Sequence, residues 1–149
     1  GSTLIYTNTH TLPTVVQVPD NAVTETTTLV YTPVDTATAP AGFAFAGNAF
    51  ELDAYRNGVL LSGFAFSVPV TVTLYYAEAD IVGLDKASLK LEYWNSVSSQ
   101  WQDAATTCTP SSVYDRHPSE NWLAVPICHL SKFALFGQHR IYLPLVLRN

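Results

Sequence analysis

Apolar and polar side chains alternate along a stretch of strand length in the middle of the chain. In residues 69–76, one face takes Val70, Val72, Leu74 and Tyr76, and the other takes Thr71, Thr73 and Tyr75. A period of two residues is the pattern of a β-strand with one buried face, because successive side chains point to opposite sides. No segment keeps the helical period over the roughly ten residues of an ordinary helix. The chain is therefore predicted to fold with little or no helix.

Turn-forming residues separate this strand from others of similar length. Further strands are predicted at residues 15–18, 29–31, 50–55, 59–66, 89–93, 122–128, 131–136 and 141–147. Asn57-Gly58 provides the positive backbone angles of a tight hairpin, and Asp85 can cap a short helical turn. Residues 96–99 form a further turn, and residues 109–121 have the character of a long surface loop. About eight to ten short strands predict an antiparallel β-sandwich of two packed sheets.

The length of 149 residues fits a single domain, 1–149, with one sizeable core. Residues 3–41 are rich in Thr and Pro and are predicted to be irregular or to form edge strands. Residues 42–136 are predicted to form the core of the sandwich. Residues 138–149 have an apolar ending, which is predicted to be an extra C-terminal strand or a sorting tail.

The charge balance and the cysteine count exclude several classes of partner. Charged residues make up 13% of the chain and the net charge is −5, so no basic surface is available to neutralise nucleic-acid phosphates. Two cysteines and four scattered histidines do not have the spacing of a structural zinc site, and no metal or cofactor is expected. No apolar run approaches the roughly 20 residues that a membrane-spanning helix requires.

The two cysteines, Cys108 and Cys128, enclose the predicted surface loop. A bridge between them would close a loop of about 20 residues and stabilise the fold by about 3 kcal/mol. The alternative is two buried thiols, and the bridge is favoured because the loop is otherwise polar. A disulfide in a chain rich in Thr, Tyr and Val favours a secreted or cell-surface location.

The segment after Cys128 places a hydroxyl nucleophile two residues after an imidazole, in the order His129, Leu130, Ser131. In an extended strand His129 and Ser131 would lie on the same face, where the imidazole can accept the hydroxyl proton. Attack of Ser131 on the Leu130 carbonyl would give an ester through an N-to-O acyl shift, and water would hydrolyse that ester. A general base contributes only about 3 to 5 kcal/mol, so backbone strain and oxyanion donors would also be required.

The last third of the chain resembles the proteolysis site that closes the autoproteolysis-inducing (GAIN) domain of adhesion receptors. The resemblance is carried by Tyr93-Trp94, Trp101, Cys108, Cys128 and the His-Leu-Ser motif. The same ending resembles the self-cleaving relatives of the ankyrin and netrin-receptor β-domain, and the apolar tail is similar to that of many bacterial secreted proteins. The resemblance implies a module that cuts itself once between Leu130 and Ser131, with neighbouring domains of a larger surface protein as partners.

The resemblance also implies a role for each residue around the cut. His129 would be the base, Leu130 would supply the carbonyl and Ser131 would be the nucleophile, while Phe133 and Leu135 would hold the C-terminal strand in its sheet afterwards. The chain departs from the receptor pattern because Leu91 and Val125 stand in place of a second cysteine pair. Cys128 also directly precedes His129, whereas the receptor pattern has one residue between them.

Two other interpretations remain open. The His-Leu-Ser segment can be an ordinary packed strand in a non-cleaving structural or adhesion module, because a motif of three residues is not sufficient for this chemistry. Alternatively, Trp94, Trp101 and Trp122 can form a sugar-stacking platform, which would make the chain a carbohydrate-binding module. Packing within the sandwich is favoured for the tryptophans, because Trp94 and Trp101 match structural positions of the family that the chain resembles.

Overall fold

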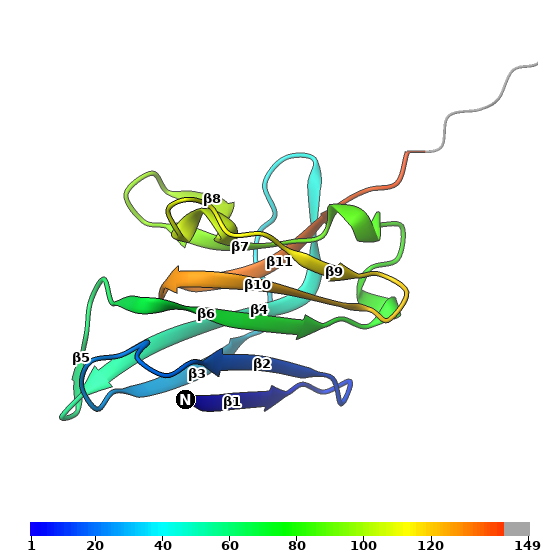
Figure 1. Cartoon of the computed structure of the whole chain (residues 1–149). Helices are drawn as coiled ribbons and strands as arrows, with labels where there is room; N and C mark the ends of the chain where they lie inside the picture. Colours follow the sequence, from blue (N-terminus) through cyan, green and yellow to red (C-terminus); the bar gives the residue numbers. More distant parts are fainter. Residues whose placement is uncertain (142–149) are drawn as a thin grey trace, which may run out of the picture.

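The computed structural model describes residues 1–141 and shows two antiparallel β-sheets packed face to face (Figure 1). Within these residues the regular structure consists of eleven strands and three short 3-10 turns. The prediction of an all-β sandwich with little helix is confirmed. The predicted tail strand at residues 141–147 lies almost wholly outside the described residues, and Ile141 itself is exposed and belongs to no strand.

The first sheet has the strand order β1-β2-β6-β10-β9. Its strands are β1 (Ser2–Thr7), β2 (Pro13–Val18), β6 (Ala65–Tyr75), β10 (Trp122–His129) and β9 (Asp115–His117). The second sheet has the order β3-β4-β11-β7-β8, and a short strand, β5, pairs with the end of β4. Its strands are β3 (Thr28–Val34), β4 (Phe43–Arg56), β5 (Val59–Leu60), β11 (Lys132–Gln138), β7 (Lys90–Asn95) and β8 (Gln100–Asp103).

Local sequence signals account for much of this structure. In β6, Val70, Val72 and Leu74 are completely buried, whereas the intervening residues are half-buried on the outer face. Asn57-Gly58 has positive φ angles of 51° and 74° and connects β4 to β5 as the hairpin prediction required. The predicted helical turn is also present as η2 (Lys86–Ser88), where the Asp85 side chain accepts a hydrogen bond from the Ala87 amide.

The predicted break between strands 59–66 and 69–76 is displaced. The chain leaves the second sheet after Leu60 and enters the first sheet at Ala65, and β6 then continues without interruption through Pro69. A proline has no backbone N–H, so it cannot donate one of the hydrogen bonds that join a central strand to its neighbours. Pro69 is tolerated because the neighbouring strand β2 pairs only with residues 71–74 of β6 and ends before it.

The first forty residues are more regular than predicted. They form three strands, of which β3 lies at the edge of its sheet as expected. In contrast, β2 is an interior strand, because residues 2–7 form an additional strand that pairs along its whole length. The prediction of an edge strand at residues 15–18 is therefore wrong.

The segment predicted as a surface loop, residues 109–121, contains the short strand β9 and packs against the sandwich. The Tyr114 hydroxyl lies 2.9 Å from the Leu91 carbonyl oxygen and 2.6 Å from Asp103 Oδ1. Burial is the main cause that raises the pKa of Tyr114 above its ordinary value. The Arg116 guanidinium donates to the Leu89 carbonyl oxygen and stacks over the Tyr114 ring. These contacts hold the segment against β7.

Apolar side chains fill the space between the sheets, and a smaller cluster covers the outer face of the second sheet. The smaller cluster contains Ala49, Ala134 and Phe136, packed against the connection between β3 and β4 and against Trp101. As a result β11 is buried on both faces: Phe133 and Leu135 point into the main core, and Ala134 and Phe136 point into the outer cluster.

Candidate functional site

The His-Leu-Ser segment is the connection between the two sheets. His129 is the last residue of β10 in the first sheet, and Lys132 is the first residue of β11 in the second. Leu130 and Ser131 lie between these strands and belong to neither. The prediction that His129 and Ser131 share one face of a continuous strand is therefore wrong, because the two sheets of a sandwich lie about 10 Å apart and the chain must bend to cross.

Backbone hydrogen bonds fix this crossover on both sides. The Leu130 amide donates to the Phe64 carbonyl oxygen at 3.1 Å, which ties the crossover to the connection between β5 and β6. The Ser131 carbonyl oxygen accepts from the Leu52 amide at 3.1 Å, which ties it to β4. The peptide groups on both sides of the Leu130–Ser131 bond are thus held by hydrogen bonds to neighbouring segments.

The Ser131 hydroxyl is engaged by the backbone of β7. Ser131 Oγ donates a hydrogen bond of 3.0 Å to the Trp94 carbonyl oxygen. A hydroxyl has a single proton, so this bond uses the proton that a base would have to remove before nucleophilic attack. The side chain therefore connects the crossover to the second sheet in the arrangement that the structure shows.

The His129 imidazole faces the carbonyl that precedes Ser131. His129 Nδ1 lies 3.4 Å from the Leu130 carbonyl oxygen, and the ring packs edge-on against the Tyr93 ring with a centroid distance of 5.0 Å. Within residues 1–141, no hydrogen bond joins His129 to Ser131. The predicted base and nucleophile are therefore neighbours along the chain, but they are not in contact as a catalytic pair.

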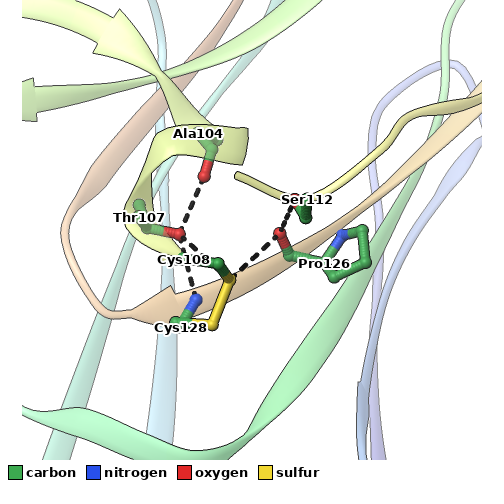
Figure 2. Close-up of a disulfide and its surroundings, with 6 residues drawn as sticks. All are labelled: Ala104, Thr107, Cys108, Ser112, Pro126 and Cys128. Carbon is green, nitrogen blue, oxygen red and sulfur yellow. Dashed lines mark hydrogen bonds between the residues drawn. A yellow bond between two sulfur atoms is a disulfide. The ribbon is translucent and has the colours of Figure 1, made fainter. Parts of the chain in front are cut away.

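Cys108 and Cys128 form the predicted disulfide, which attaches the end of β10 to the 3-10 turn η3 (Ala104–Thr107) (Figure 2). Two side-chain hydrogen bonds support the bridge. Thr107 Oγ1 accepts from the Cys128 amide at 3.0 Å, and Ser112 Oγ donates to the Pro126 carbonyl oxygen at 2.7 Å. The strand that leads into the crossover is thereby fixed one residue before His129.

The three tryptophans do not form a common platform. Trp94 and Trp101 are a T-shaped pair on the outer face of the second sheet, with ring centroids 5.4 Å apart, and Trp101 packs against Phe136. Trp122 belongs to the first sheet, where its ring is stacked on His117 at 3.8 Å. The expected packing role fits Trp101 best, whereas Trp94 remains 37% exposed.

Two hollows flank the crossover. One, of about 370 Å³, lies between Leu130-Ser131 and the segment around β5, and the other, of about 480 Å³, lies between the crossover and the end of β7. Among residues 1–141, no group of three or more His, Cys, Asp or Glu side chains is arranged to hold a metal ion. In the same part of the chain, no helix is long and apolar enough to cross a membrane.

The sequence did not reveal the partners of the motif. Phe64, Leu52 and Trp94 contact Leu130 and Ser131 through backbone atoms, and the identities of their side chains therefore carry no signal for these contacts. The edge-on contact of Tyr93 with His129 follows from the position of β7 beside β11. Only knowledge of the strand order would have brought these residues together.

No protein-family model matches the chain, and no curated protein or solved structure is significantly similar to it. The resemblance to self-cleaving domains therefore depends on the sequence motif alone.

Proposed function

We propose that the chain is a structural β-sandwich module of a larger extracellular protein, in which the His-Leu-Ser segment joins the two sheets and stays uncut. The observation that supports this proposal is the hydrogen bond from the Ser131 hydroxyl to the Trp94 carbonyl oxygen. It gives Ser131 a role in holding the crossover that requires no chemistry.

The energy that cleavage demands also favours this proposal. A half-life of about two hours corresponds to a barrier of about 23 kcal/mol, to which a general base contributes only about 3 to 5. No hydrogen bond connects His129 to Ser131 in the described residues, and His129 Nδ1 lies 3.4 Å from the Leu130 carbonyl oxygen. A bond of that length is too weak to supply the stabilisation that an oxyanion needs.

An extracellular location is supported by the disulfide, since such bonds persist in oxidising compartments. The neighbouring domains of the same protein would be the partners of a module of this kind. No ligand is required for the structural role.

Self-cleavage is the second candidate function, and one contact favours it. A protonated His129 Nδ1 would polarise the Leu130 carbonyl, whose oxygen is the atom that becomes negative. Ser131 would first exchange its bond to Trp94 for one to a base. Its oxygen would then bond to the Leu130 carbon, the carbon–nitrogen bond would break with a proton passing to the Ser131 nitrogen, and water would hydrolyse the ester.

The intact mass of the protein under denaturing conditions separates the two functions. We expect a single full-length species, because the hydroxyl proton is engaged by Trp94. Both cysteines precede residue 130, so no disulfide could hold two fragments together. Fragments 1–130 and 131–149, together heavier than the uncut chain by one water, would overturn the structural proposal in favour of self-cleavage.

Ser131→Ala is the matched control. In a structural module this substitution leaves the mass pattern unchanged and lowers the free energy of unfolding by about 1 kcal/mol through loss of the hydrogen bond to Trp94. In a self-cleaving protein the same substitution abolishes the fragments.

A further inference from the structure

The hollow on the β7 side of the crossover is neutral. Its lining includes Tyr93, Trp94, Ser96, His129 and Ser131, and it contains no Asp, Glu, Lys or Arg. A binding site for a charged ligand needs an opposite charge or a row of directed dipoles, and no side chain of this hollow provides the charge. The chemistry of the hollow therefore favours an uncharged ligand.

Three hydrogen-bonding groups of this hollow have no partner within residues 1–141. They are the indole nitrogen of Trp94, the hydroxyl of Ser96 and Nε2 of His129. The other polar side chains of the hollow do have hydrogen-bond partners. Asn95 donates to Gln102 and accepts from the amide of Val97, and Ser131 donates to Trp94.

The unengaged groups offer both donors and an acceptor. The indole N–H only donates, and the Ser96 hydroxyl can donate or accept. If His129 carries its proton on Nδ1, which faces the Leu130 carbonyl oxygen, its Nε2 is left as an acceptor. A ligand with several hydroxyl groups, each a donor and an acceptor, matches this set.

Trp94 adds an apolar surface to these polar groups. The Trp94 side chain is 37% exposed, although Trp101 packs against it edge to face. Trp94 lines the hollows on both sides of the crossover, and Gly63, Ser96, Leu130 and Ser131 line both as well. The two hollows therefore adjoin, but only the one on the β7 side is neutral, because Glu51, Asp53 and Lys132 line the other.

We infer that this neutral hollow, on the β7 side of the crossover, binds an uncharged oligosaccharide, with Trp94 against one of its sugars and the Ser96 hydroxyl and His129 Nε2 at hydroxyl groups along the chain of sugars. An aromatic ring with a few convergent uncharged polar groups suits the apolar faces and polar rims of sugars. This site differs from the platform of three tryptophans considered from the sequence, because it uses Trp94 alone. It adds a ligand to the structural module and does not depend on whether the backbone is cut.

The test is isothermal titration calorimetry of the whole chain with soluble oligosaccharides of cellulose, xylan, mannan and chitin. We expect at least one of them to bind with a dissociation constant below about 1 mM. Trp94→Ala is expected to weaken that binding by at least about tenfold, because it removes the stacking surface. It leaves the backbone carbonyl that holds Ser131 in place.

Two further variants make the result specific. Trp122→Ala removes a tryptophan from the other sheet and should leave binding unchanged. His129→Phe keeps an aromatic ring beside Tyr93 but removes Nε2, and should weaken binding severalfold. The site is refuted if none of the oligosaccharides binds, or if Trp94→Ala binds as tightly as the original chain while circular dichroism shows both to be folded. An equal loss in Trp122→Ala would also refute it.

Discussion

At the scale of single residues, Gly47 occupies a backbone position that other residues fill only with strain. Its φ angle is +86°, and it lies where β4 carries extra residues opposite β11, between the pairs Ala134–Ala49 and Phe136–Phe45. A Cβ atom at Gly47 would overlap with the carboxyl carbon of Asp80. Glycine is required here for two reasons: it adopts the positive φ angle without strain, and it leaves room for the Asp80 side chain.

Gly47→Ala is therefore predicted to lower the free energy of unfolding by about 2 to 3 kcal/mol, as measured by urea denaturation. Gly58→Ala is the control, because Gly58 has a similar φ of +74° but nothing within 4 Å of the added carbon. It should cost about 1 kcal/mol, which is the cost of the backbone angle alone. Equal losses in the two variants would show that the Asp80 contact has no effect.

Glu92 is a buried carboxyl on β7. The residue is only 8% exposed, and its Oε2 atom has no hydrogen-bond partner in the described part of the chain. Burial raises the pKa of Glu92 above its ordinary value of 4.5, and the negative charge of Asp103 raises it further, whereas Lys90 lowers it. The folded protein therefore binds a proton at Glu92 more tightly than the unfolded chain does.

This raised pKa makes stability depend on pH in a defined direction. The contribution of Glu92 is fully present below the pKa of the unfolded chain, near 4.5, and is lost as pH rises through the higher pKa of the folded state. Glu92→Gln is predicted to remove this loss and to raise the free energy of unfolding at neutral pH by about 1 kcal/mol. Urea denaturation between pH 4 and 8 measures the free energy of unfolding of both proteins. Asp35→Asn, which removes an exposed carboxylate, is the control for net charge. A pH profile unaltered by Glu92→Gln would contradict the prediction.

At the scale of elements, the strands could be predicted better than the connections. Alternation predicted which side of β6 is buried, and the turn residues after β4 predicted the β4–β5 hairpin. His129 and Ser131 were expected on one face of an extended strand, yet His129 ends β10, and Leu130 and Ser131 form the crossover to the other sheet. The sequence could not show this, because whether two successive strands pair or belong to different sheets depends on the neighbours that they find.

The disulfide is predicted to be the main stabilising link of the crossover. It closes a loop of 20 residues between η3 and β10, so replacing both Cys108 and Cys128 by Ala should lower the free energy of unfolding by about 3 kcal/mol. Thermal and urea unfolding provide the measurement. Reduction should destabilise the original chain by a similar amount and leave the double variant unaffected. A reductant effect on the double variant would point to a cause other than this bridge.

At the scale of the whole molecule, aromatic rings connect the two sheets near their β1 and β3 edges. Consecutive ring centroids are 4.7 Å apart for Tyr6 and Tyr31, 4.8 Å for Tyr31 and Phe50, and 5.5 Å for Phe50 and Phe133. Tyr6 comes from the first sheet and the other three from the second. Burial raises the pKa of Tyr31 to about 12, which keeps its hydroxyl neutral within this row.

Phe50→Ala is predicted to lower the free energy of unfolding by about 3 to 5 kcal/mol, because it opens a cavity in the middle of this row. Phe45→Ala is the matched control on the same strand. Phe45 is half-buried in the smaller outer cluster, so its loss should cost clearly less. Equal costs would mean that the outer cluster contributes as much to stability as the core between the sheets. Urea denaturation of both variants gives the comparison.

The sequence by itself determined the β-sandwich class, most of the strands, the β4–β5 hairpin and the pair of cysteines that bridge. These depend on side-chain period, turn residues and residue type, which are local properties. The tertiary structure alone decided that Ser131 donates to Trp94, that His129 faces the Leu130 carbonyl oxygen, and that Trp122 lies apart from the other tryptophans. Each of these contacts joins residues through strand order and sheet membership, which arise from packing the two sheets over one core.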